Sequence, residues 1–257
     1  MSEREKIINL PGVITALICV LAAFQLVIDN GPETVVGTIY RAFAFIPARL
    51  SLLIDPQSLL PTRSTLDYDA QEALEQLNAA MGVSRLSILT LFSYAFLHAG
   101  WTHLGVNALT LAAFGSPVAR RLGDFPFLVF LAGGAVAGAG AHFLLHPLDL
   151  TPMVGASAAI SAAMAGIVRF AFAPGVILGG TRPDRRALQS PAESLATLAG
   201  NRSAVTFVVI WFATNALFGA FPQTLGSNAA VAWEAHVGGF VYGLLTFALF
   251  ETWARGR

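Results

Sequence analysis

The sequence has a single cysteine and very little charge. Cys19 has no partner in the chain, so an intrachain disulfide is excluded and the cysteine content gives no indication of the redox compartment. Charged residues make up 12% of the 257 residues, whereas hydrophobic residues make up 55%. Ordinary soluble domains of this length carry about twice that share of charge. The composition therefore argues against a soluble domain and predicts that a lipid bilayer surrounds the chain.

The chain also lacks any excess of charge of one sign. Fifteen Lys and Arg residues offset 15 Asp and Glu residues, so the formal net charge is zero. Nucleic-acid binding normally needs a basic surface, and nothing in this balance indicates one. We expect no nucleic-acid partner.

Long apolar runs replace the missing charge. About 20 apolar helical residues span the hydrocarbon core of a bilayer, and six segments fit that length approximately. Their continuous hydrophobicity differs from the alternation of β-barrel strands. The sequence therefore predicts an all-α, polytopic membrane protein with a single domain over residues 1–257. The predicted spans are residues 11–28, 101–119, 125–146, 153–173, 204–221 and 230–252.

The first apolar run has a basic start and a short apolar core, as a signal peptide has. Asp29, Asn30, Gly31 and Pro32 follow it and make a poor cleavage site, which favours a retained helix. Five more apolar segments follow along the chain. We therefore expect the first helix to belong to the membrane domain.

Basic residues predict the orientation, because short cytoplasmic loops are enriched in Lys and Arg. With the N-terminus and C-terminus in the cytoplasm, most basic residues lie on that side, including Arg120 and Arg121. Residues 29–100 then form a long outer loop, in which residues 43–53 and 68–81 are expected to form interfacial helices. Residues 174–203 form a cytoplasmic linker. The short six-span form favours a bacterial inner membrane.

Polar groups within predicted spans are costly and therefore indicate function. The second span contains His103 and Asn107, one helical turn apart; the fourth contains Ser157; and the sixth contains Glu234 and His236. All three of these spans run inward from the outer surface in the predicted topology. Because each residue lies a few positions past the outer boundary, the three sites are expected at similar depth.

These residue types suit acyl transfer by a serine. A serine hydroxyl becomes a strong nucleophile when a neighbouring imidazole removes its proton, and Ser157 and His236 are the candidates for that pair. Attack on a carbonyl creates an oxyanion, which a backbone N–H near Ser157 and the side chains of His103 and Asn107 could stabilise. The sequence therefore predicts a Ser/His pair with nearby donors.

Small residues predict close contact between the fourth and sixth spans. Gly239 and Gly243 form one small face, and Ser157, Ser161 and Ala165 form another. Such faces let two backbones approach closely, which would bring the serine within reach of the histidine.

Three motifs in this order resemble the rhomboid intramembrane proteases. They are the stretch from His98 to Asn107, the Gly155-Ala-Ser157 motif, and the stretch from Ala235 to Gly243. The resemblance implies a six-helix bundle in which Ser157 is the nucleophile and His236 the general base. It also implies that His103 and Asn107 are oxyanion donors, and that Gly155 leaves room for the scissile peptide.

The resemblance further implies the substrate, which would be a transmembrane segment of another membrane protein, cut near its outer end. The fifth span and residues 222–233 are similar to the gate and cap of these proteases. Two positions depart from the family pattern, because Ala158 replaces a glycine and Ser161 replaces a tyrosine that packs on the catalytic histidine. The alternative function is a catalytically inactive rhomboid-like protein that binds transmembrane helices.

Other catalytic classes have weaker support. His142 and His146 lie one turn apart, as metal ligands can, but no His-Glu-x-x-His motif accompanies them. Asp124 and Asp149 fall between predicted spans, which excludes an intramembrane aspartyl protease. The paired broken helices of a transporter are also missing. We therefore expect neither a metal nor a cofactor.

Overall fold

The computed structural model describes residues 10–56, 58, 72, 75–76, 78–79, 81–172, 191–220 and 232–256. These residues are mainly helical, and the β-structure among them is one isolated bridge between Phe45 and Met153. The all-α prediction is confirmed.

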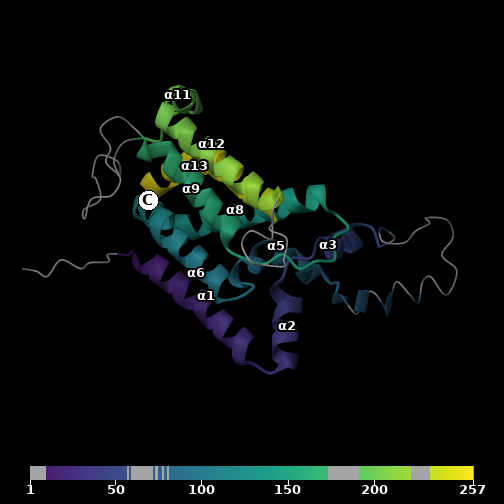
Figure 1. Ribbon diagram of the computed structural model, residues 1–257. Coiled ribbons are helices and arrows are strands. Elements are labelled where there is room, and N and C mark those ends of the chain that lie inside the picture. The colour runs from purple at the N-terminus through teal and green to yellow at the C-terminus, as the bar shows by residue number, and fades with distance from the viewer. Residues whose placement is uncertain are drawn as a thin grey trace, which may run out of the picture.

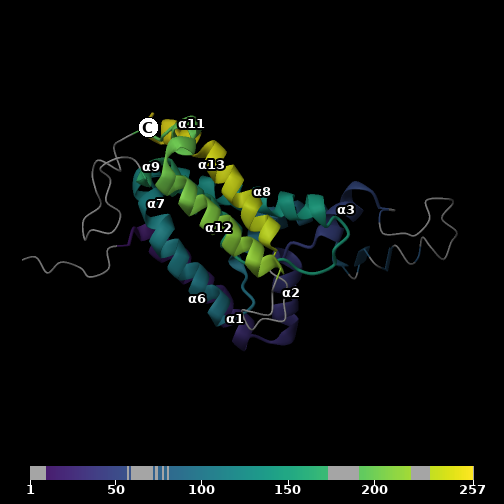
Figure 2. The same ribbon diagram turned by 45° about the horizontal axis from the view of Figure 1, so that its top comes forward.

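The long helices lie side by side in a bundle (Figures 1 and 2). A π-helical turn, η3 (Leu111–Gly115), joins α6 to α7 in one helical segment. The helices of the bundle are α1 (Gly12–Asn30), α6 (Trp101–Thr110), α7 (Ser116–Leu122), α8 (Asp124–Leu145), α9 (Ser157–Ala171), α12 (Arg202–Ala220) and α13 (Trp233–Arg255).

Three of the described helices, α1, α8 and α13, are long and apolar enough to cross a membrane. Helix α9 and the apolar part of α12, Arg202–Leu217, are also apolar but shorter than 18 residues. Each of the six predicted segments contains a helix, while the number of crossings stays a prediction.

Helix α9 begins at Ser157, four residues after the approximate start predicted for the fourth span at residue 153. Met153 is paired in the β-bridge with Phe45, and Gly155 has a φ of 121°. A right-handed helix cannot include that φ value. Ser157 is therefore the first residue of its helix and does not lie in the helix interior.

Helix α13 packs on α8 and α9 through small residues. A Cβ atom added to Gly239 or Gly243 would overlap the backbone of Ala158 or Ala162, respectively. On the α8 side, Gly138 approaches the Ala158 methyl group in the same way. These contacts hold the three helices at a separation that larger side chains would prevent.

The predicted small face of α9 is therefore wrong in register. The residues of α9 that meet the α13 glycines are Ala158 and Ala162, one position after Ser157 and Ser161. Ser157 instead points its hydroxyl at His236, and Ser161 donates to the Ser157 carbonyl oxygen at 2.8 Å. A step of one residue turns a side chain by about 100° around a helix, so the two faces are distinct.

Short helices connect α1 to α6 and gather at the end of the bundle opposite the C-terminus (Figure 1). They are α2 (Glu33–Phe43), α3 (Pro47–Ile54), η1 (Arg85–Leu89), α5 (Thr90–Ser93) and η2 (Tyr94–Phe96). The helix predicted at residues 43–53 is interrupted by the extended stretch before Pro47. The one predicted at residues 68–81 lies largely outside the described residues.

Helix α3 is packed into the protein more deeply than an interfacial helix would be. Ala48 and Leu52 are almost fully buried. The Ser51 hydroxyl donates to the Pro147 carbonyl oxygen at 2.6 Å, and the Ala48 N–H donates to that of Asp149 at 3.0 Å. The connection between α1 and α6 thereby holds the loop between α8 and α9.

At the other end of the bundle, Glu251 of α13 connects several elements. Its carboxylate forms an ion pair with Arg121 of α7, accepts from Arg255 at 3.0 Å, and accepts from the backbone N–H of Ala192 at 2.9 Å. Arg121 also lies over the Phe170 ring of α9, 4.5 Å from its centroid. Most of the predicted linker 174–203 lies outside the described residues; its end contains α11 (Leu195–Gly200).

Candidate active site

Ser157 is the first residue of α9, and the chain that leads to it is held on two sides. Met153 exchanges backbone hydrogen bonds with Phe45, and the Gly155 N–H donates to the Tyr94 carbonyl oxygen at 3.1 Å. Gly155 takes the positive φ that side-chain-bearing residues rarely adopt. These contacts fix the direction from which the chain enters the helix, and with it the position of the serine hydroxyl.

His236 lies in the first turns of α13 and meets that hydroxyl. Its Nε2 atom is 2.7 Å from Ser157 Oγ. Gly239, one turn further along α13, lies against the Ala158 backbone, so α9 and α13 approach each other closely beside Ser157 and His236. The structure therefore brings together the serine and the histidine that the sequence singled out.

Asn215 of α12 holds the other side of the imidazole. Its Oδ1 atom is 2.7 Å from His236 Nδ1, and its amide nitrogen donates to the Trp211 carbonyl oxygen at 2.8 Å. An amide oxygen can only accept, so Nδ1 carries the proton and Nε2 presents a lone pair to the serine hydroxyl. This is the tautomer that a general base requires.

The sequence analysis missed Asn215. An amide inside a strongly apolar predicted span was the available signal, since buried polar groups in membrane helices need partners. Asn215 is 9% exposed, and its partner lies on another helix.

His103 of α6 borders the approach to Ser157. A Cβ atom at Gly155 would lie 2.8 Å from His103 Nε2 and 3.8 Å from Ser157 Oγ. Glycine at this position therefore leaves open a space that the imidazole and the hydroxyl both line. The buried ring of His98 packs edge-on against His103, with 5.0 Å between the ring centroids.

Asn107 is engaged within its own helix. Its amide nitrogen donates to the His103 carbonyl oxygen at 2.9 Å, and the residue is 4% exposed. Among the described residues, no hydrogen bond joins Asn107 to Ser157 or His236. Asn107 therefore has a hydrogen bond within α6 and none to Ser157 or His236 in the described structure.

The N-terminus of α9 has backbone N–H groups without a hydrogen-bond partner among the described residues. The first backbone bond within the helix runs from the Ile160 N–H to the Ala156 carbonyl oxygen, so the N–H groups of Ser157, Ala158 and Ala159 precede it. Ala156, which precedes the helix, provides no side-chain acceptor for them. These N–H groups and the positive end of the helix dipole favour an anion at the N-terminus of α9.

The structure shows the surroundings of Ala158 and Ser161, the two residues that depart from the rhomboid pattern. The Ala158 methyl group points at Gly138 of α8, where glycine makes room for it. The Ser161 hydroxyl donates to the backbone of its own helix, and no hydrogen bond joins it to His236 in the described structure. The extra methyl group of Ala158 is thus accommodated, whereas serine at position 161 provides no aromatic ring to pack on His236.

Two comparisons with known proteins bear on the family of the chain. The chain is 36% identical over 80 residues to the Bacillus subtilis (strain 168) protein named "Putative rhomboid protease YdcA". That alignment covers 31% of this chain and 40% of the relative, so the chain matches less than half of the relative's length. Residues 85–252 match the Rhomboid domain, and this range contains Ser157, His236 and Asn215. Because the domain match covers more than half of the sequence, the chain belongs to the rhomboid family.

Proposed function

We propose that the protein is an intramembrane serine endopeptidase that cuts transmembrane segments of other membrane proteins. Its family and its apolar helices make it a multi-pass integral membrane protein. The observation that carries the proposal is the 2.7 Å contact between Ser157 Oγ and His236 Nε2, with His236 Nδ1 bound to Asn215.

In the proposed reaction, Ser157 Oγ attacks the scissile carbonyl carbon while His236 Nε2 takes its proton. The carbon–nitrogen bond then breaks, and His236 gives the proton to the departing amine. Water hydrolyses the resulting acyl-enzyme by the same steps in reverse order, with His236 again as the base. Asn215 keeps the proton on Nδ1 throughout and stabilises the imidazolium.

The oxyanion would form beside the N-terminus of α9. The Ser157 hydroxyl and the imidazole of His103 border the space that Gly155 leaves open, and the backbone N–H of Ser157 begins the same helix. A preorganised donor at such a position typically contributes about 2.7–4 kcal/mol to transition-state stabilisation. One amide hydrogen of Asn107 is bonded to the His103 carbonyl oxygen, so only its second hydrogen is available to the oxyanion, and we assign it a smaller share than His103.

The proposed substrate follows from the position of the pair. Ser157 and His236 lie where α9 and α13 begin, near one end of the bundle, so a scissile bond near the end of a substrate helix would meet them. The predicted topology, with both termini cytoplasmic, makes this the outer end. Helix α12 has exposed apolar residues, including Val209 and Leu217, that suit contact with lipid or a substrate helix. The predicted cap, residues 222–233, lies almost wholly outside the described residues.

One observation favours a second candidate, a rhomboid-like protein that binds transmembrane helices without cutting them. Ser161 stands where the family places a tyrosine on the catalytic histidine, and its hydroxyl contacts α9 instead. The hydrogen bond that His236 Nδ1 donates to Asn215 Oδ1 argues for the protease, because it holds the imidazole from the other side.

The test is labelling of the purified protein in detergent with a fluorophosphonate or an isocoumarin serine probe. Wild type is expected to label, and Ser157→Ala and His236→Ala are expected to lose the label. Ser161→Ala is the matched control: it removes a hydroxyl from the same helix that bonds only to backbone, and should label like wild type. A folded wild type that does not label would favour the helix-binding protein.

A further inference from the structure

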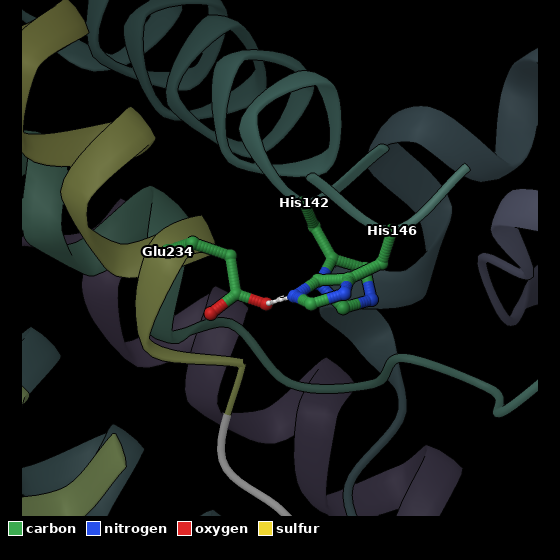
Figure 3. A group of neighbouring side chains, drawn as sticks. All are labelled: His142, His146 and Glu234. Carbon is green, nitrogen blue, oxygen red and sulfur yellow. Dashed lines mark hydrogen bonds and ion pairs between the residues drawn. The ribbon is translucent and has the colours of Figure 1, made fainter. Parts of the chain in front are cut away.

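A second cluster of polar side chains lies where α8 ends and α13 begins. Figure 3 shows His142 and His146 of the α8 end pointing toward Glu234 of α13. His142 Nδ1 is 2.6 Å from Glu234 Oε1, and His146 Nε2 is 3.3 Å from the same oxygen. The two imidazoles come from adjacent turns, whereas the carboxylate lies 92 residues after His142 in the sequence.

The three side chains form a ligand set. One donor atom from each lies within 4.8 Å of the other two. Two ligand atoms at about 2.0–2.1 Å from a tetrahedral zinc ion lie roughly 3.3 Å apart, so small rotations would bring these three to metal-binding distances. Two histidines with one carboxylate is also a set that zinc uses in proteins.

Access to the cluster is from one side. The side chains of His142 and Glu234 are 8% and 7% exposed, whereas that of His146 is 51% exposed. An ion can therefore reach the cluster past His146 and lose most of its water there. Asp149 Oδ2 lies 4.0 Å from His142 Nε2, the ring nitrogen that does not face Glu234, so we assign the fourth ligand position to a water molecule.

We propose that His142, His146 and Glu234 bind a divalent transition metal ion of the zinc type. The ion would replace the proton shared between His142 and Glu234, because metal binding needs neutral imidazole and ionised carboxylate. It would join the end of α8 to the first turn of α13, two residues before His236. The sequence predicted no metal because no His-Glu-x-x-His motif accompanies the two histidines; the fold supplies Glu234.

The experiment uses the full-length protein in detergent, freed of metal with a chelator and titrated with Zn²⁺ against a chromophoric zinc chelator. Wild type is expected to bind one equivalent. Removing an outer partner of a metal ligand typically weakens binding about 10- to 100-fold, so His146→Ala and Glu234→Gln, which remove direct ligands, should lose more. Co²⁺ should give a visible spectrum in wild type that both variants lack.

Asp124→Asn is the matched control, because Asp124 is also a first-turn carboxylate of a long helix but lies at the opposite end of α8. It should bind Zn²⁺ like wild type. His146 is half exposed, so His146→Ala should fold, and its melting temperature without metal checks this. Zn²⁺ should raise the melting temperature of wild type and of Asp124→Asn, but not that of His146→Ala.

Two outcomes would overturn the site: a wild type without saturable binding at one equivalent, or His146→Ala and Glu234→Gln variants that bind as wild type does. In either case the cluster is an ion pair between α8 and α13. The readout does not depend on protease activity. Loss of serine labelling with intact Zn²⁺ binding would reject the proposed function alone, and the reverse result would reject the metal site alone.

Discussion

The contact between Gly239 and Ala158 offers a direct test of whether helix packing sets the distance between Ser157 and His236. A Cβ atom at position 239 would lie 2.8 Å from the Ala158 carbonyl carbon and still closer to its oxygen, whereas ordinary contact begins at 3.4 Å. The obstacle is backbone, so Gly239→Ala forces α13 and α9 apart by roughly 1 Å, a misplacement that can cost about 100-fold in rate.

The stability cost of the same change is modest. Overpacking a close contact typically costs about 1–3 kcal/mol. Alanine is favoured over glycine inside a helix by about 0.5–1 kcal/mol, which offsets part of that cost. Because Ser157 directly precedes Ala158, the separation lengthens the 2.7 Å contact between Ser157 Oγ and His236 Nε2. We therefore expect Gly239→Ala to fold and to react about 100-fold more slowly with the serine probe.

Two matched variants separate geometry from stability. Gly243→Ala meets the Ala162 backbone in the same way, but one turn further from His236, so it should lose similar stability and less than about 10-fold in labelling rate. Gly140→Ala has open space around its new Cβ atom and should match or exceed wild type in both. Labelling rates are compared with melting temperatures. A wild-type rate in Gly239→Ala, or equal losses in Gly239→Ala and Gly243→Ala, would refute the reasoning.

Two further predictions concern Asn215 and Glu251. Asn215→Ala should slow serine labelling about 10- to 100-fold, by analogy with other partners that orient a reactive group, while Asn215→Asp, which can still accept from His236 Nδ1, should recover most of the rate. A wild-type rate and pH profile in Asn215→Ala would remove Asn215 from the mechanism. Glu251→Ala leaves the Arg121 side chain buried without its carboxylate and should cost about 3–5 kcal/mol. Thermal unfolding measures this, and an unchanged melting temperature would contradict it.

The sequence predicted that Ser157 and His236 lie together because three kinds of local information agree there. Apolar runs predict helices and basic residues predict their direction, so residues near the outer ends of the second, fourth and sixth segments were expected at one depth. Close packing needs small residues, and the glycines of α13 are visible in the sequence. The pair of Ser157 and His236 follows from depth, small residues and motif order together.

The sequence alone determined the helical class, the apolar segments and the candidate residues for serine chemistry, because these depend on composition and on spacing along the chain. Only the tertiary structure showed that Asn215 meets His236, that Glu234 joins His142 and His146, and that Ala158 is the residue against Gly239. Each of these contacts depends on how a helix is rotated about its axis. A uniformly apolar helix has no polar face to reveal that rotation, so it is set by packing against its neighbours.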